Sequence, residues 1–180
     1  EQMEELGLPQ EEVQRVEREH WKLPDVRRRV ISRLLEEKWY SQAEPLLRES
    51  KEMDREWPGL VSEYSQKLIG LYEETGQMEK LLEELKFQVF QCGQSDLNYV
   101  KKLRERIPPD QWPELRERLL VEKTLYGDLR EELLEQEGLY DRLMERVAAL
   151  ESLSTLDRWE YTLRPRFPER MRDAYIQCLE

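Results

Sequence analysis

The chain has 180 residues, of which 38% are charged and 38% are apolar, a balance typical of amphipathic helices. Its net charge of −11 argues against direct binding of nucleic acid, because an acidic surface repels phosphate groups. No apolar run approaches the roughly 18 residues of a membrane span, and the acidic first residues are unlike a signal peptide.

Residues 1–23 are predicted to form a leading acidic helix, or part of a helical hairpin, with its helix running from Pro9 to His20. Residues 1–20 contain seven Glu and two Arg, and only Val13 and Val16 make a thin apolar stripe. The first residue is not Met, so we expect a fragment of a longer protein.

Residues 24–180 repeat a two-helix pattern and are predicted to form one helical repeat domain. In the clearest copy, residues 68–85, one apolar face ends at Gly76 and the next begins at Met78. In the first copy Lys38-Trp39-Tyr40 is the predicted turn. The looser copies lie at residues 30–47, 103–119, 134–147 and 159–174.

Several local signals predict where individual helices begin. Ser41 and Glu44 have the spacing of a capping box, and Trp57-Pro58-Gly59 is predicted to break the chain. Further along, a short helix that bears Leu125 and Leu129 is predicted to end at Gly138, and Ser154 is predicted to start the helix that carries Trp159.

The copies can be aligned on the first aromatic or apolar residue of each second helix, at intervals of 38, 34, 28 and 27 residues. The aligned residues are Tyr40, Met78, Trp112, Tyr140 and Phe167. A tetratricopeptide unit has about 34 residues, with apolar positions three and seven residues after the aligned one. The predicted fold is therefore all-α: antiparallel helical hairpins stacked as an irregular, right-handed, tetratricopeptide-like α-solenoid.

Four phrases also resemble the helical tail of bacterial SWIM zinc-finger proteins, which occur widely in Firmicutes and are mostly uncharacterised. They are residues 30–40, 68–85, 139–143 and 161–175, the last with an Arg-Pro-Arg-Phe-Pro core. The resemblance covers roughly residues 25–180. The Cys-x-Cys…Cys-x-His zinc pattern of that family is absent from this sequence, so zinc binding is carried over to no residue.

The sequence offers few residues for catalysis or metal binding. His20 is the one histidine and is predicted to contact carbonyls at a helix end. Cys92 and Cys178 are predicted to be structural thiols of a reduced, cytoplasmic protein, although the sequence leaves a disulfide between them open. The acidic pairs are expected to be solvated, including Glu83-Glu84 and Glu131-Glu132. We therefore expect no enzyme activity, no cofactor and no metal.

Two basic clusters interrupt the acidic chain. One is Arg27-Arg28-Arg29, and the other comprises Arg158, Arg164, Arg166, Arg170 and Arg172. Each cluster either pairs within the molecule or forms a docking patch for an acidic partner segment or a neighbouring domain.

The sequence predicts a non-catalytic protein-interaction or scaffold module of a larger bacterial protein. The expected partner is a protein or peptide, or a neighbouring domain of the same chain, and neither nucleic acid nor a membrane. Most of the five tryptophans are expected to pack between hairpins, while one or two could anchor the partner. The alternative is a structural spacer that positions an upstream zinc-finger domain.

Overall fold

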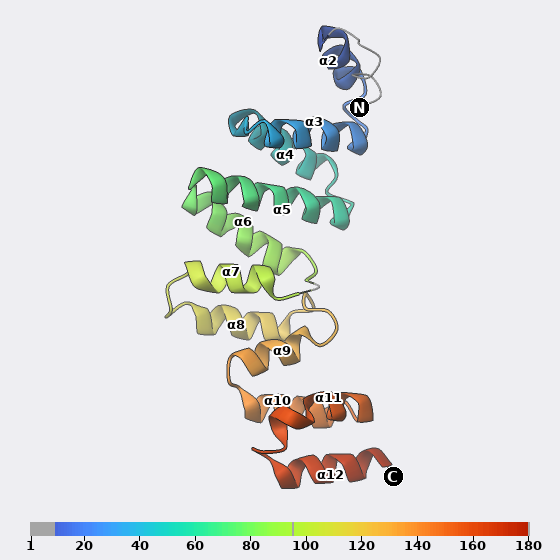
Figure 1. Cartoon of the computed structure of the whole chain (residues 1–180), viewed down its shortest axis with the longest axis vertical. Helices are drawn as coiled ribbons and strands as arrows, with labels where there is room; N and C mark the ends of the chain where they lie inside the picture. The colour runs from blue at the N-terminus through green and yellow to red at the C-terminus, as the bar shows by residue number, and fades with distance from the viewer. Residues whose placement is uncertain (1–9, 95, 180) are drawn as a thin grey trace. The chain divides into compact units, whose positions relative to one another are not determined.

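The structure, a computed structural model, describes residues 10–94 and 96–179. In these residues every regular element is an α-helix, apart from one isolated parallel bridge between Gln94 and Leu125 (Figure 1). The predicted all-α fold class is therefore confirmed. In the same residues no helix has both the length and the apolar character that crossing a bilayer demands.

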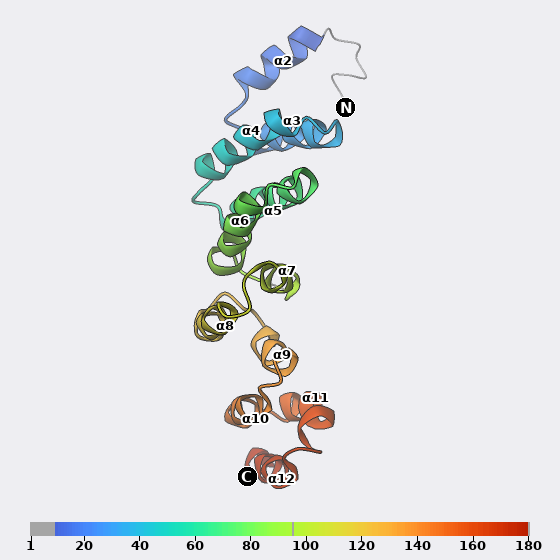
Figure 2. The same cartoon turned by 90° about the vertical axis from the view of Figure 1, so that its left-hand side faces the viewer.

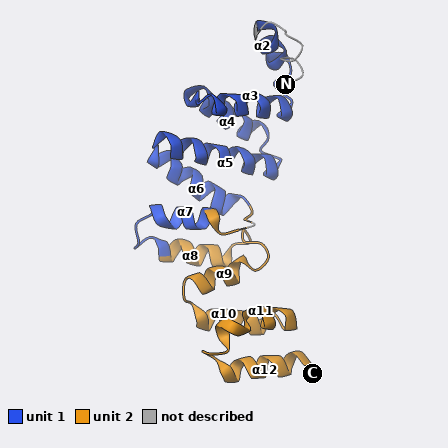
Figure 3. Cartoon of the chain, viewed as in Figure 1, with its two compact units in different colours: residues 1–92, 99–112 blue, residues 93–98, 113–180 orange. Residues whose placement is uncertain are grey.

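The chain divides into two compact units (Figure 3). Unit 1 comprises residues 1–92 and 99–112, and unit 2 comprises residues 93–98 and 113–180. This division does not test the predicted domain boundary between residues 23 and 24, which stays a prediction. Pro9, the predicted start of the first helix, lies outside the described residues.

Unit 1 contains the first helices of the described chain. They are α2 (Gln10–Glu19), α3 (Pro24–Glu36), α4 (Tyr40–Met53), α5 (Pro58–Thr75), α6 (Met78–Gln91) and α7 (Asn98–Arg106), the last beginning one residue inside unit 2. Helices α3 and α4 form one hairpin and α5 and α6 form another, and α4 packs on α5 to join the two (Figures 1 and 2).

Unit 2 contains the remaining helices. They are α8 (Trp112–Val121, beginning one residue inside unit 1), α9 (Leu129–Gln136), α10 (Tyr140–Ala149), α11 (Leu153–Leu163) and α12 (Pro168–Leu179). Helices α9 and α10 pack as one hairpin and α11 and α12 as the next, and α10 contacts both helices of the second hairpin. Four of the five aligned residues are the first residues of their helices, whereas α12 begins one residue after Phe167.

Three hairpins turn on the same backbone geometry. Lys38 (φ 59°), Gly76 (φ 68°) and Gly138 (φ 68°) all adopt the left-handed conformation. The residue after each donates its amide to the carbonyl five residues earlier, which ends the first helix. These bonds are Trp39 N to Leu34 O (2.8 Å), Gln77 N to Tyr72 O (3.1 Å) and Leu139 N to Leu134 O (2.9 Å).

The shared turn starts the second helix at the same point in each of these hairpins. As predicted, the positions three and seven residues after that start are core positions, and each is at most 1% exposed. They are Ala43 and Leu47 in α4, Leu81 and Leu85 in α6, and Leu143 and Val147 in α10. The two-helix pattern in the sequence therefore corresponds to a repeated local structure.

The predicted capping box at Ser41 is wrong. Helix α4 already begins at Tyr40, so Ser41 lies inside its first turn, and no side-chain cap bond is found at this end in the described part of the chain. The Glu44 carboxylate instead accepts hydrogen bonds from three side chains. These are Lys80 Nζ (2.7 Å), Tyr72 Oη (3.0 Å) and Arg48 Nε (3.2 Å).

Other predicted helix starts are also shifted. The break falls at Trp57, because Pro58 suits a first turn and opens α5. Leu125 lies outside α9, since the chain bends at Gly127 (φ 58°) before that helix. The cap of α11 is Ser152, whose hydroxyl accepts from the Thr155 amide at 3.4 Å; the predicted starter, Ser154, is two residues further on.

We expect opposite effects from alanine at two glycines with open surroundings. Gly76→Ala forces a Cβ into the left-handed region and should destabilise unit 1 by about 1 kcal/mol. Gly70→Ala lies inside α5, where alanine is the better helix former, and should stabilise by about 0.5–1 kcal/mol. Urea unfolding of both variants checks this. If Gly76→Ala leaves the stability unchanged or raises it, the assigned left-handed turn is contradicted.

Candidate functional site

The five predicted docking arginines belong to unit 2, and each has a partner inside the molecule. Arg158 pairs with Asp128 and Glu132 near the start of α9. Arg164 pairs with Glu160 at 2.6 Å, one turn earlier in the chain. This pairing matches the intramolecular alternative.

The remaining three arginines are also engaged. Arg166 donates to the Thr162 carbonyl at 2.7 Å, and its guanidinium lies 4.0 Å from the centre of the Tyr140 ring. Arg170 lies 3.7 Å from Asp141, and Arg172 contacts Asp173 at 2.8 Å. Arg164 and Arg172 both line a cavity between α11 and α12. A docking role for the five stays a prediction.

The other candidate residues are the histidine and the two cysteines. His20 is exposed just after α2, and both described cysteines are thiols that form no disulfide. Burial raises the pKa of the Cys92 thiol, which disfavours the nucleophilic thiolate. No group of three or more His, Cys, Asp or Glu side chains in the described residues is placed to hold a metal ion.

Two residues of the acidic pairs are buried, so the prediction of solvated faces is wrong for them. Glu84 is 8% exposed and accepts from Lys51 at 2.5 Å, and Glu131 is 1% exposed and pairs with Arg146. Each lies on the apolar face of its helix, where it is desolvated and needs a charged partner. Their partners come from neighbouring helices, which the sequence does not reveal.

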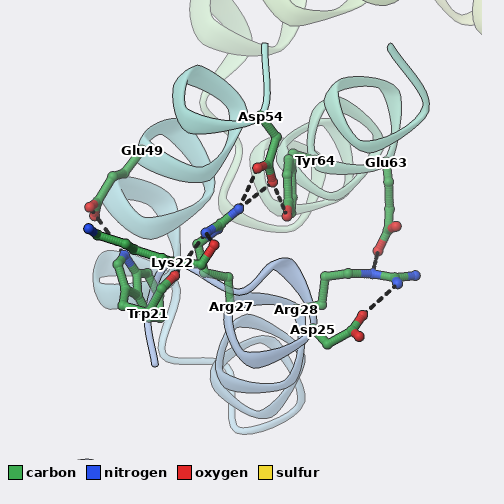
Figure 4. Close-up of polar contacts among 9 residues, drawn as sticks. All are labelled: Trp21, Lys22, Asp25, Arg27, Arg28, Glu49, Asp54, Glu63 and Tyr64. Atoms are coloured by element: carbon green, nitrogen blue, oxygen red, sulfur yellow. Dashed lines mark hydrogen bonds and ion pairs between the residues drawn. The ribbon is translucent and has the colours of Figure 1, made fainter. Parts of the chain in front are cut away.

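The basic run at residues 27–29 contains an arginine that is completely buried. The Arg27 Nη2 atom lies 2.5 Å from both carboxylate oxygens of Asp54, which is the residue after α4 (Figure 4). Its Nη1 atom donates to the carbonyls of Trp21 (2.8 Å) and Lys22 (2.9 Å). Tyr64 of α5 donates to the same aspartate at 2.9 Å. We call this group the Arg27 clamp.

The clamp joins three parts of unit 1. It ties the link between α2 and α3 to the end of α4 and to α5. A second bond holds the same link, since Trp21 Nε1 donates to Glu49 of α4 at 3.1 Å (Figure 4). Helix α2 is held further by two bonds from Arg33 of α3 to Glu17, at 2.9 and 3.0 Å.

A cavity of about 510 Å³ lies among α2, α3 and α4, and we call it the α2–α4 groove. Each helix contributes side chains spaced as one helical face. The lining residues are Gln14, Glu17, Arg18 and Trp21 from α2 and its link, Val30, Arg33, Leu34 and Glu37 from α3 and its end, and Trp39, Gln42, Leu46 and Glu49 from α4 and its N-cap. The volume lies in the range of about 300–1,000 Å³ that is usual for binding sites.

The groove has an apolar floor and a polar rim. Val30 and Leu34 are 9% and 7% exposed and form the buried part, whereas Trp39 remains 49% exposed. Trp112 and Trp159 are buried, as expected of packing residues, and Trp57 is exposed outside this groove. A large, exposed aromatic side chain beside an apolar cavity is a typical anchor for a bound partner.

Comparisons of the chain with family models, with curated proteins and with solved structures found no match. The sequence indicates one or two of the tryptophans as possible anchors, but it does not predict the groove. The signal that could have found it is the spacing i, i+3, i+4, i+7 shared by its residues in the first two helices.

Removal of Arg27 should be strongly destabilising. Arg27→Met leaves Asp54 as a buried, unpaired charge, which costs about 3–5 kcal/mol. Adding Asp54→Leu and Tyr64→Phe removes the orphaned carboxylate and hydroxyl and should recover part of the loss. Urea unfolding of the single and triple variants measures both values. A triple variant less stable than the single one would contradict the clamp.

Stability should fall at alkaline pH. Burial, together with hydrogen bonds to Asp54 and Glu44, raises the pKa values of Tyr64 and Tyr72 from 10.0 to about 12. Their contribution is complete below pH 10 and is lost as the pH rises from 10 to about 12. The double variant Tyr64→Phe/Tyr72→Phe should therefore lose less stability over this range. Urea unfolding at several pH values tests this, and equal losses would be contrary to expectation.

Proposed function

We propose that the chain is a non-catalytic protein-interaction or scaffold module whose hairpins stack as a right-handed, tetratricopeptide-like α-solenoid. The shared left-handed turn and the shared core positions support this arrangement. On this proposal the module belongs to a larger, cytoplasmic bacterial protein of the kind whose helical tails it resembles. Its partner is a protein or peptide, or a neighbouring domain of the same chain.

One observation carries the proposal. The α2–α4 groove combines an apolar floor with the half-exposed Trp39. A purely structural surface gains nothing from an exposed tryptophan beside an apolar cavity, because the uncovered apolar area is a loss of hydrophobic stabilisation.

The alternative is a structural spacer that positions a zinc-finger domain. A specific observation favours it: the five arginines predicted to dock a partner all contact groups of their own unit. A spacer needs only such internal pairing, and it binds no peptide at the α2–α4 groove.

We expect Trp39→Ala to weaken peptide binding, with Trp57→Ala as the matched control. Both tryptophans are exposed N-cap residues of unit 1, but only Trp39 lines the groove. Loss of a central aromatic anchor costs about 2 kcal/mol or more, which weakens binding by at least tenfold.

The probes are three labelled peptides of about 18 residues, or five helical turns. They share one leucine face and carry Lys, Gln or Glu on the polar face. Fluorescence anisotropy should show at least one peptide that loses affinity with Trp39→Ala and keeps it with Trp57→Ala. If none does so, the groove is not a peptide site and the spacer is favoured.

A further inference from the structure

The α2–α4 groove has a length and a charge that narrow the class of its occupant, an inference that rests on the proposed function. The lining residues of α3 run from Val30 to Glu37, which is about 10 Å along a helix. This length matches roughly two turns of a bound helix, or three residues of an extended chain. The cavity of about 510 Å³ therefore accommodates one apolar face of a segment, rather than a whole helix.

The lining charges are unequal. Glu17 and Arg33 neutralise each other through two hydrogen bonds. The remaining charged residues are Glu37 and Glu49 against Arg18, so the rim has an acidic excess. Glu37 and Glu49 are both exposed, and Glu49 already accepts from Trp21 with one oxygen. A carboxylate accepts up to about four hydrogen bonds, so this contact leaves capacity for a cation.

The aromatic side chains add to the preference for a cation. Trp39 lies at the same end of the groove as Glu37, two residues along the chain. The face of an indole attracts Lys and Arg groups, and tryptophan is the best of the aromatic side chains in this respect. The net charge of −11 acts in the same direction at long range, because it speeds the approach of a basic partner.

We infer that the α2–α4 groove binds a basic amphipathic helix of another protein. Its apolar side chains, at i and i+4, lie over Val30 and Leu34, and Lys or Arg residues beside them meet Glu37 and Glu49. The Arg27 clamp positions the wall of this site, because it holds the backbone of Trp21 in place. The occupant of the groove is thus basic, whereas the arginines of unit 2 would suit an acidic partner.

The test compares the lysine, glutamine and glutamate peptides on the intact chain and on Glu37→Gln/Glu49→Gln. The lysine peptide should bind most tightly and the glutamate peptide least. The double variant should lower the affinity for the lysine peptide about fivefold. It should change the affinity for the glutamine peptide by less than about twofold, because only the rim charges change. The intact chain should lose a similar amount of affinity for the lysine peptide when the salt concentration is raised from about 50 to about 500 mM.

A matched control is Glu79→Gln/Glu83→Gln. It removes the same charge from exposed positions of α6, outside the groove. If the control weakens the lysine peptide as much as the groove variant does, attraction is nonspecific and the inference is overturned. Glutamine at position 49 retains an oxygen that can accept from Trp21, so the groove variant should unfold at the same urea concentration as the parent chain.

The remaining outcomes separate the inference from the proposed function. If the glutamine or glutamate peptide binds best, and Trp39→Ala abolishes that binding, the groove is a peptide site but its preference for basic segments is wrong. If no peptide responds to Trp39→Ala, the proposed function fails as well. Sedimentation velocity addresses a second copy of the chain: a dimer that Trp39→Ala dissociates would overturn the inference, and a monomer supports it.

Discussion

The left-handed turn between paired helices is the constraint on which the hairpins depend. A residue with positive φ ends one helix and lets the next begin two residues later, so that the apolar faces of both helices meet. Gly76 and Gly138 adopt this conformation without a Cβ penalty, whereas Lys38 adopts it despite one. The surrounding packing therefore determines the turn at Lys38, with Ala43 and Leu47 completely buried just beyond it.

Buried charge performs a second structural role in unit 1. The Arg27 clamp satisfies two backbone carbonyls and a carboxylate that would otherwise be desolvated without partners. Replacing such a cluster by apolar residues can leave the free energy of unfolding unchanged. The main effect of the clamp is therefore to position the segments that it joins. It determines where the link between α2 and α3 runs, and with it the position of Trp21 in the groove wall.

The binding surface that we propose and the one expected from the sequence differ in place and in charge. The clustered arginines of residues 158–172 stand out in an acidic chain, but a local surplus of charge does not show which acids lie opposite in space. Asp128 and Glu132, at the start of α9, and Asp141 of α10 contact these arginines. The α2–α4 groove, in contrast, is formed by ordinary residues of three helices and has no compact motif in the sequence.

The sequence by itself determined the helices, the pairing of most of them and the core positions, because apolar periodicity and turn residues act over a few residues. It could have indicated Arg27 as well, since that residue shares a face with Val30, Ile31 and Leu34. Only the tertiary structure decided which charges are buried, where Leu125 lies, and that three helical faces enclose a groove. These features depend on contacts between residues far apart in the chain, for which a local pattern carries no signal.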